Sequence, residues 1–219
     1  MKNIVFVSPP AAGKGTQSKL ISEKYNIPHI STGDLLREEI NNQTKLGKEI
    51  KEIIDSGEFV SDEIITKLLY NRLSMEDCNN GFILDGYPRN LNQAKIYEEL
   101  LQSLNKDLGK IIFLNIDKET ALNRISGRLV CPTCGASYNT NVASLSPKEE
   151  NICDKCKSHL SKRSDDDIDT FSKRFDIYLE KTNPLLEYYK LKNVLEEIKI
   201  DKETTSNETF ESINEILRR

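Results

Sequence analysis

The sequence predicts an α/β fold in which a parallel sheet of five strands is flanked by helices. Short apolar runs rich in β-branched residues alternate with longer stretches of helical periodicity, which is typical of strand–helix–strand units. The first run leads directly into a tight turn of small residues followed by a lysine. Composition shifts once, at Val130–Ser164, where cysteines replace periodic apolar residues and indicate an inserted lobe.

Five apolar runs are the expected strands, and six periodic stretches are the expected helices. The runs lie at Ile4–Val7, Ile27–Ile30, Phe82–Leu84, Ile111–Ile116 and Val194–Ile200. Several of the periodic stretches begin with a plausible Ser, Thr, Asp or Asn N-cap. These stretches cover Thr16–Tyr25, Thr32–Ile40, Asp62–Leu73, Leu91–Leu104, Lys118–Ile125 and Ile168–Leu179.

Composition limits the class of protein. With 219 residues, 37 % hydrophobic residues and a net charge of -4, the chain can bury a core and shows neither the composition of a disordered protein nor a strongly basic surface. No apolar stretch reaches the roughly 18 residues of a membrane span, and the N-terminal run is too short for a signal peptide. We therefore expect a cytoplasmic monomer with no membrane or nucleic-acid partner.

The residues after the first run predict a phosphate-binding loop. Backbone N–H groups of the turn and of the following helix would hold phosphate oxygens, Lys14 would supply a point charge, and the Thr16 hydroxyl would lie near a Mg²⁺ ion. The match to G-x-x-x-x-G-K-[ST] is imperfect, because Ser8 replaces the first glycine and Gly15 stands where Ser or Thr is usual. A small-residue turn without a ligand is the alternative interpretation.

Three ordered motifs resemble those of the adenylate kinase family. They are Gly13-Lys14-Gly15-Thr16-Gln17, Ser31-Thr32-Gly33-Asp34-Leu35-Leu36-Arg37, and Asp85-Gly86-Tyr87-Pro88-Arg89 with Gln93. The resemblance covers nearly the whole chain and implies the reaction ATP + AMP ⇌ 2 ADP with Mg²⁺. It also implies a P-loop NTPase-type core of residues 1–30, 61–126 and 165–219, an AMP-binding lobe of residues 31–60, and a zinc-containing lid of residues 127–164.

The same resemblance implies a role for individual residues. The implied ATP-binding residues are Ala11, Ala12, Gly13, Lys14, Gly15, Thr16, Arg128, Ser137, Tyr138 and Lys202. The implied AMP-binding residues are Thr32, Arg37, Glu58, Phe59, Val60, Gly86, Tyr87, Pro88, Arg89, Gln93, Arg163 and Arg174. The implied catalytic residues are Lys14, Arg89, Arg124, Arg163 and Arg174, and Asp85 is assigned to Mg²⁺ through water.

Arginine usage points independently to phosphate binding. Phosphoryl transfer requires fixed positive charge around the moving group. The chain has 22 lysines and nine arginines, yet six of the arginines lie at the motif positions, where a bidentate guanidinium suits phosphate. Arg124 and Arg128, four residues apart, are expected on one helix face, where their charges repel unless an anion lies between them. Any one of these arginines alone could be a solvated surface cation.

Two polar residues of the implied site have simpler alternatives. Asp85 ends an apolar strand ahead of Gly86, so it could instead cap a turn between strand and helix. Thr32 and Gln93 resemble the residues that select adenine, since the Gln93 amide offers a donor and an acceptor to a base edge. A surface glutamine would look the same in the sequence.

Four of the five cysteines predict a structural metal site. Cys131, Cys134, Cys153 and Cys156 have the spacing Cys-x₂-Cys-x₁₈-Cys-x₂-Cys, which is typical of zinc ribbons. Four thiolates leave no open position for water, so the Zn²⁺ would brace a lobe with few apolar residues. Two disulfides, or cobalt or iron in place of zinc, are alternatives. Cys78 is expected to be a buried thiol outside the site.

The lid also permits a reading as a nucleic-acid-binding zinc ribbon. Its charge argues against that function, because residues 131–163 carry five Lys or Arg against three Asp or Glu, with Tyr138 as the one aromatic residue. The acidic run Asp165–Asp167, with Asp169, is expected to open a helix. We further hypothesise that Asp165 and Asp166 pair with lid arginines between turnovers.

The sequence departs from the family at two positions of the loop, and two other kinase functions are alternatives. Ser8 and Ala11 replace residues that are usually glycine in the family, and we predict that both keep negative φ. Kinases that phosphorylate UMP, CMP or GMP share every phosphate-binding argument, although Gln93 and the long lid favour AMP. A P-loop kinase with a non-nucleotide acceptor would leave Thr32, Arg37 and Gln93 without a role.

Overall fold

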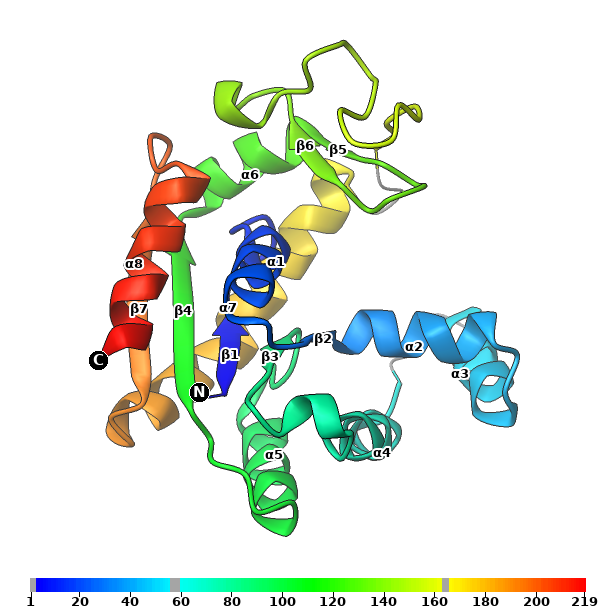
Figure 1. The fold of residues 1–219 in the computed structure, drawn as a ribbon, viewed down its shortest axis with the longest axis vertical. Helices are drawn as coiled ribbons and strands as arrows, with labels where there is room; N and C mark the ends of the chain where they lie inside the picture. The colour runs from blue at the N-terminus through cyan, green and yellow to red at the C-terminus, as the bar shows by residue number, and fades with distance from the viewer. Residues whose placement is uncertain (1–2, 56–59, 163–165) are drawn as a thin grey trace.

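The computed structural model describes residues 3–55, 60–162 and 166–219 and contains the predicted five-stranded sheet. Its strand order is β2-β3-β1-β4-β7, and all neighbouring strands run parallel (Figure 1). This confirms the α/β fold class. The strands are β1 (Ile4–Val7), β2 (His29–Ser31), β3 (Ile83–Asp85), β4 (Lys110–Ile116) and β7 (Leu195–Ile200).

The helices follow the predicted order, with two additions. α3 and α8 were not predicted, and α7 continues beyond the expected end at Leu179 because Leu185 and Tyr189 are both buried. It does so despite Pro184 inside the helix. The helices are α1 (Lys14–Tyr25), α2 (Thr32–Asn41), α3 (Lys45–Asp55), α4 (Asp62–Leu73), α5 (Leu91–Ser103), α6 (Lys118–Ser126), α7 (Ile168–Leu191) and α8 (Ser206–Arg218), with short 3₁₀ turns at Glu76–Cys78 and Ala143–Leu145.

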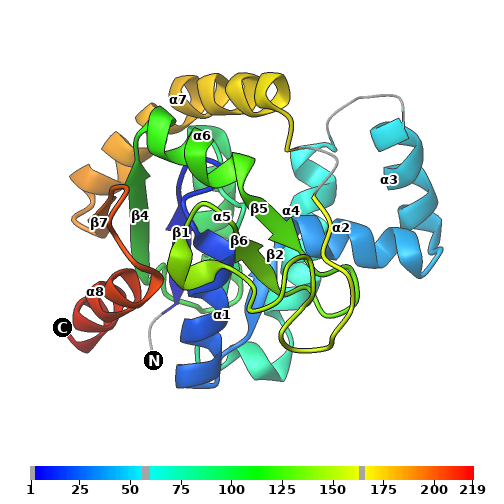
Figure 2. The same ribbon diagram turned by 90° about the horizontal axis from the view of Figure 1, so that it is seen from above.

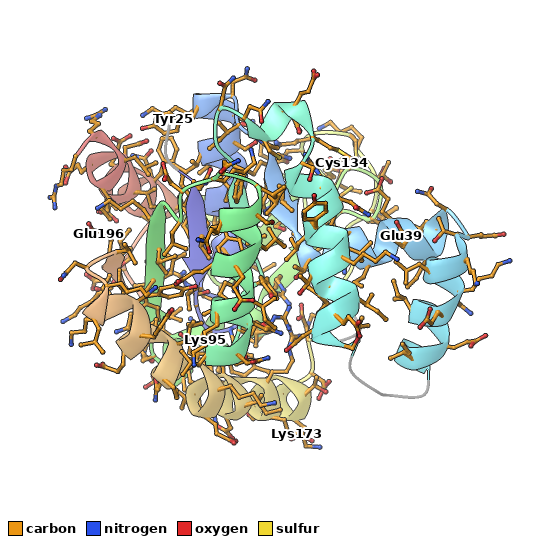
Figure 3. The ribbon with its side chains drawn as sticks, turned by 90° about the horizontal axis from the view of Figure 1, so that it is seen from below. Tyr25, Glu39, Lys95, Cys134, Lys173 and Glu196 are labelled. Atoms are coloured by element: carbon orange, nitrogen blue, oxygen red, sulfur yellow. The ribbon has the colours of Figure 1, made fainter. Side chains whose placement is uncertain are left out.

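Helices cover both faces of the sheet. α1 and α8 pack on one face, where Ile21 and Ile213 are fully buried against the strands. α4, α5 and the end of α7 pack on the other, around Leu69, Tyr97 and Tyr189. Figure 3 shows the side chains of these helices around the sheet, with Tyr25 on α1 and Lys95 on α5 among those labelled. Among the described residues, none of the helices combines the length and apolarity needed to cross a bilayer.

Two pieces project from this core. α2 and α3 form an arm that extends away from the sheet (Figure 1), and they cross so closely that a Cβ at Gly47 would lie 1.9 Å from the Glu39 carbonyl oxygen. The other piece carries a small antiparallel pair, β5 (Arg128–Val130) and β6 (Ser137–Asn139), which overlies α1 when seen from above (Figure 2). The carboxyl edge of the sheet lies between the α2–α3 arm and the β5–β6 pair (Figure 1).

The prediction that Arg124 and Arg128 share one helix face is wrong. α6 ends at Ser126 with Gly127 as its C-cap, so Arg128 lies on β5 and does not share a helix face with Arg124. The segment after β6 packs against this helix end, since the Gly127 carbonyl accepts from Thr140 N at 2.9 Å. Only glycine fits at position 127, because a Cβ there would lie 2.6 Å from Asn139 Oδ1 and 2.8 Å from Asn141 N.

Candidate active site

The parallel strands bring the predicted motifs to one edge of the sheet. Strand register sets Phe6 and Ser31 level with Asp85, on either side of it. The loop after β1, the start of α2 and the Gly86 turn therefore begin side by side. Carboxyl edges where neighbouring connections diverge are the usual ligand sites of such sheets.

The loop after β1 leaves the N-terminus of α1 open to an anion. Gly13, the N-cap, has φ 96° and provides no side-chain cap, while its carbonyl accepts the N–H of Gln17 at 3.1 Å. The first N–H groups of a helix lack intrahelical partners and sit at the positive end of its dipole. This arrangement suits phosphate oxygens.

Ala11 contradicts the prediction of negative φ. It has φ 64°, the left-handed conformation that costs a non-glycine residue about 1–2 kcal/mol. Its side chain packs against the hydrophobic cluster beneath the loop, where the buried Ala12 also lies. Tertiary packing thus imposes on Ala11 the geometry that glycine adopts freely, whereas Ser8 is not among the positive-φ residues of the described chain.

Ser8 holds the lysine of the loop. Its Oγ accepts a hydrogen bond from Lys14 Nζ at 2.9 Å and donates one to the Pro9 carbonyl at 2.9 Å. The Ser8 carbonyl lies 3.3 Å from the same ammonium. A glycine at position 8 would offer the carbonyl alone, so the substitution adds a ligand to Lys14.

Positive charge dominates the surroundings of Lys14. Burial of the ammonium lowers the pKa of Lys14, and the charges of Arg89, Arg174 and Arg128 lower it further, while Asp85 opposes them. Burial alone would raise the pKa of Asp85, but His29, Lys14 and Arg89 together hold it below its ordinary value. Of the charged groups that shift the pKa of Lys14, three are arginines and one is a carboxylate, an arrangement that suits an anionic ligand.

A second cluster lies next to this loop. The Gly86 carbonyl accepts from Arg89 Nε at 2.7 Å and from Thr32 Oγ1 at 3.2 Å. Gly86 has φ 84°, and a Cβ there would lie 3.0 Å from Thr32 Oγ1 and 3.3 Å from an Arg89 nitrogen. Arg37 pairs with Asp34 on the exposed face of α2. Thr32, Gly86 and Arg89, predicted separately along the sequence, are therefore in contact.

The Gln93 amide is engaged by the protein itself. Gln93 is 7 % exposed; its Oε1 accepts from Arg89 N at 2.7 Å and its Nε2 donates to Asp62 Oδ1 at 2.7 Å. Asp62 is a residue that the sequence reasoning missed, because an acidic residue in the first turn of a helix is also an ordinary dipole partner. A shallow apolar depression nearby is lined by Thr32, Leu35, Leu36, Ile65 and Leu68.

Three cationic side chains that were expected to bind ATP or the transferred phosphoryl group form hydrogen bonds or ion pairs with the protein itself. Arg124 Nη2 donates to the Asp201 and Thr204 carbonyls at 3.3 and 3.1 Å. Arg128 forms a bidentate pair with the Asp166 carboxylate, which is 2 % exposed. Lys202 pairs with Glu119. The Arg128–Asp166 pair is a contact of the kind hypothesised from the sequence, between Asp165 or Asp166 and an arginine of residues 127–164.

The four cysteines form one cluster. Their Sγ atoms all lie within 4.8 Å of one another, and those of Cys131 and Cys156 and of Cys134 and Cys153 are 3.3 and 3.5 Å apart. These separations exceed the disulfide length of about 2.05 Å and suit four thiolates around one ion. Hydrogen bonding from the Tyr138 hydroxyl, 3.4 Å away, lowers the pKa of Cys153. Cys78 lies buried outside the cluster, as predicted.

The remaining predicted residues divide into two groups. Ser137 and Tyr138 lie on β6, and the buried Tyr87 and Pro88, joined by a cis peptide bond, follow β3. Arg174 lies on α7 near Lys14, and Val60 precedes α4. Glu58, Phe59, Arg163 and Asp165 lie outside the described residues.

Comparison with known proteins supplies a family. The adenylate kinase family model matches residues 6–194. An adenylate kinase of Clostridium tetani is 46 % identical over 215 residues, 98 % of either chain. One from Fervidobacterium nodosum is 49 % identical over 193 residues, 88 % of either chain, and one from Caldanaerobacter subterraneus is 42 % identical over 214 residues, 98 % of this chain and 95 % of its own.

The Ser8 contact yields a test of the loop. We expect Ser8→Ala to lower the free energy of unfolding by about 1–2 kcal/mol at neutral pH, because a buried ammonium loses a charge-assisted hydrogen bond. Since the folded-state pKa of Lys14 already lies below 10.5, this difference should shrink as pH rises through that lowered pKa and the amine becomes neutral. Urea unfolding at several pH values measures it, and an equal stability of both proteins at neutral pH would contradict the role of Ser8.

Proposed function

Because this chain belongs to the adenylate kinase family, we propose that its active site transfers the γ-phosphoryl group of ATP to AMP and gives two molecules of ADP. The observation that carries the proposal is the excess of cationic groups around Lys14, directly beside the contact between Thr32, Gly86 and Arg89. One cluster suits a polyphosphate and the other a second, smaller phosphate-bearing ligand. A kinase for two nucleotides needs both.

The ATP side is assigned to the loop after β1. Backbone N–H groups from Ala11 to Thr16 would surround the β- and γ-phosphates, and Lys14 would exchange the Ser8 oxygens for phosphate oxygens. Arg128 would leave Asp166 for the phosphates when the lid approaches. Arg124 and Arg174 would stabilise charge on the transferring group, and Arg163 is assigned with them from family resemblance.

The AMP side is assigned to the Gly86 turn and the arm. Arg89 and Arg37 would bind the AMP phosphate bidentately, which is the geometry that guanidinium groups favour with phosphate. The apolar side chains that line the depression between α2 and α4, with Thr32 among them, would pack against the adenine ring. Gln93 would contact the adenine ring through the amide N–H and the oxygen lone pair that its protein partners do not use.

Asp85 fits a role toward Mg²⁺. Nearby cations hold the pKa of this carboxyl below its ordinary value, so it stays ionised, and carboxylate oxygen is a preferred Mg²⁺ ligand, directly or through water. Bound Mg²⁺ would offset the charge of the β- and γ-phosphates. His29 Nε2 lies 3.7 Å from Asp85 Oδ2, and this contact helps to set the position of the carboxylate.

The cysteine cluster fits a structural Zn²⁺ ion. Its four sulfur atoms would complete the tetrahedron, and the backbone N–H groups of Cys131 and Cys153 close two similar turns by donating to Ala136 and Ser158. The ion would keep β5 and β6, and thus Arg128, in register. A monomeric state and a cytoplasmic location remain predictions from the sequence.

The proposed reaction is tested by supplying ADP and Mg²⁺ to the purified chain and separating the products over time. We expect ATP and AMP in equal amounts. Arg89→Lys keeps the charge but loses the bidentate geometry, so its rate should fall about 100-fold or more. Folded, metal-loaded protein that forms no products would overturn the assignment and direct attention to kinases acting on UMP, CMP or GMP.

Metal content tests the lid assignment. We expect one bound zinc ion per chain by elemental analysis, and Cys153→Ser should lose it and lower the thermal unfolding midpoint, because metal binding contributes to folding only where all ligands meet. Cys78→Ser is the matched control, since that thiol lies outside the cluster. Zinc retained by Cys153→Ser, or lost equally by Cys78→Ser, would refute the four-thiolate site.

A further inference from the structure

We propose that Asp62 is a positioning residue that makes the acceptor site specific for 6-aminopurines. Through hydrogen bonding it fixes the orientation of the Gln93 amide, so that the amide complements adenine and excludes guanine and hypoxanthine. The inference rests on the proposed function, because it assumes that the Gln93 amide contacts the acceptor base.

The contacts around Gln93 hold its side chain at both ends. Asn90, the N-cap of α5, accepts the backbone N–H of Gln93 at 2.9 Å and fixes the start of the helix. The amide oxygen then accepts from Arg89 N at 2.7 Å, and the amide nitrogen donates to Asp62 Oδ1 at 2.7 Å. With the residue 7 % exposed, water has little room to replace either partner.

These partners permit only one orientation of the amide. A backbone N–H can only donate, and an ionised carboxylate can only accept. Turning the amide over would set its NH₂ group against the N–H of Arg89 and its oxygen against the Asp62 carboxylate. Both hydrogen bonds would be lost, and two repulsive contacts would replace them.

The carboxylate of Asp62 is itself held in place. Its other oxygen accepts from Asn92 Nδ2 at 3.2 Å, and it lies in the first turn of α4, where a negative charge meets the positive end of the helix dipole. Ile65, one turn along the same helix, lines the apolar depression assigned to the base. Asp62 therefore links the wall of that depression to Gln93.

What the amide retains determines the base it can complement. One N–H and one oxygen lone pair remain after Arg89 and Asp62 are satisfied. Adenine presents an amino donor at position 6 next to an acceptor at N1, which matches this pair. Guanine and hypoxanthine present an acceptor at position 6 next to an N1–H donor, which matches only the amide turned over. The fixed orientation thus penalises 6-oxopurines.

The test measures acceptor choice in Asp62→Ala with ATP as donor. We expect the ratio of kcat/KM for AMP to that for GMP, and likewise for IMP, to fall about tenfold or more, since an amide free to turn over no longer opposes the wrong base. The KM for ATP should stay unchanged. Glu63→Ala is the matched control, because Glu63 is exposed in the same first turn of α4 and should leave the ratio as it is.

A Gln93→Leu background separates a role through Gln93 from general damage. There, Asp62→Ala should cause no further change in the ratio. Should Asp62→Ala fail to fold, the isosteric Asp62→Asn, whose amide can present either atom to Gln93, should still lower the ratio, by less. An unchanged ratio in the folded variant, or an equal fall in the Gln93→Leu background, would overturn the inference. Failure of the proposed function would differ, because the wild-type chain would then phosphorylate no AMP.

Discussion

The ammonium of Lys14, held among arginines at the carboxyl edge of the sheet, is the constraint on which the rest of the site depends. Two oxygens of Ser8 and the charge of Asp85 offset its burial only in part, because three arginines act against them. Charges of one sign in a site of reduced dielectric repel strongly. The uncapped start of α1 adds to the same positive field instead of relieving it. The electrostatic field of such a site favours the binding of polyanions even before a ligand is present.

Several arginines of the site are paired with acceptor groups of the protein itself. Arg37 pairs with Asp34 at the surface, where an ion pair contributes little, and Arg124 rests on two carbonyl groups. The Arg128–Asp166 pair is different, since its carboxylate is almost wholly buried. Exchanging that partner for phosphate would couple the position of the lid to the presence of ATP. At the Gly86 turn, the Gln93 amide likewise has a carboxylate partner, since its Nε2 donates to Asp62 Oδ1.

Sequence reasoning found the elements with strong local signals and missed those decided by packing. β1 and α4 have the predicted bounds. α8 carries a capping box, Thr205 with Glu208, that would have revealed it, whereas α3 depends on Gly47 fitting against Glu39 across the arm. At the site, family motifs located Lys14, Thr32, Gly86 and Arg89. The left-handed Ala11 and the contact between Asp62 and Gln93 could not be predicted, because both depend on neighbours distant in sequence.

The most direct test of the charge account compares wild type with Lys14→Met in urea unfolding, with and without inorganic tripolyphosphate at constant ionic strength. Without the anion, Lys14→Met should be at least as stable as wild type, because removing a desolvated cation relieves repulsion. With the anion at about 100 times its Kd, wild type should gain about 2.7 kcal/mol and the variant far less. A variant that is markedly less stable without the anion, or that gains as much from it, would contradict the view that this site holds like charges close together.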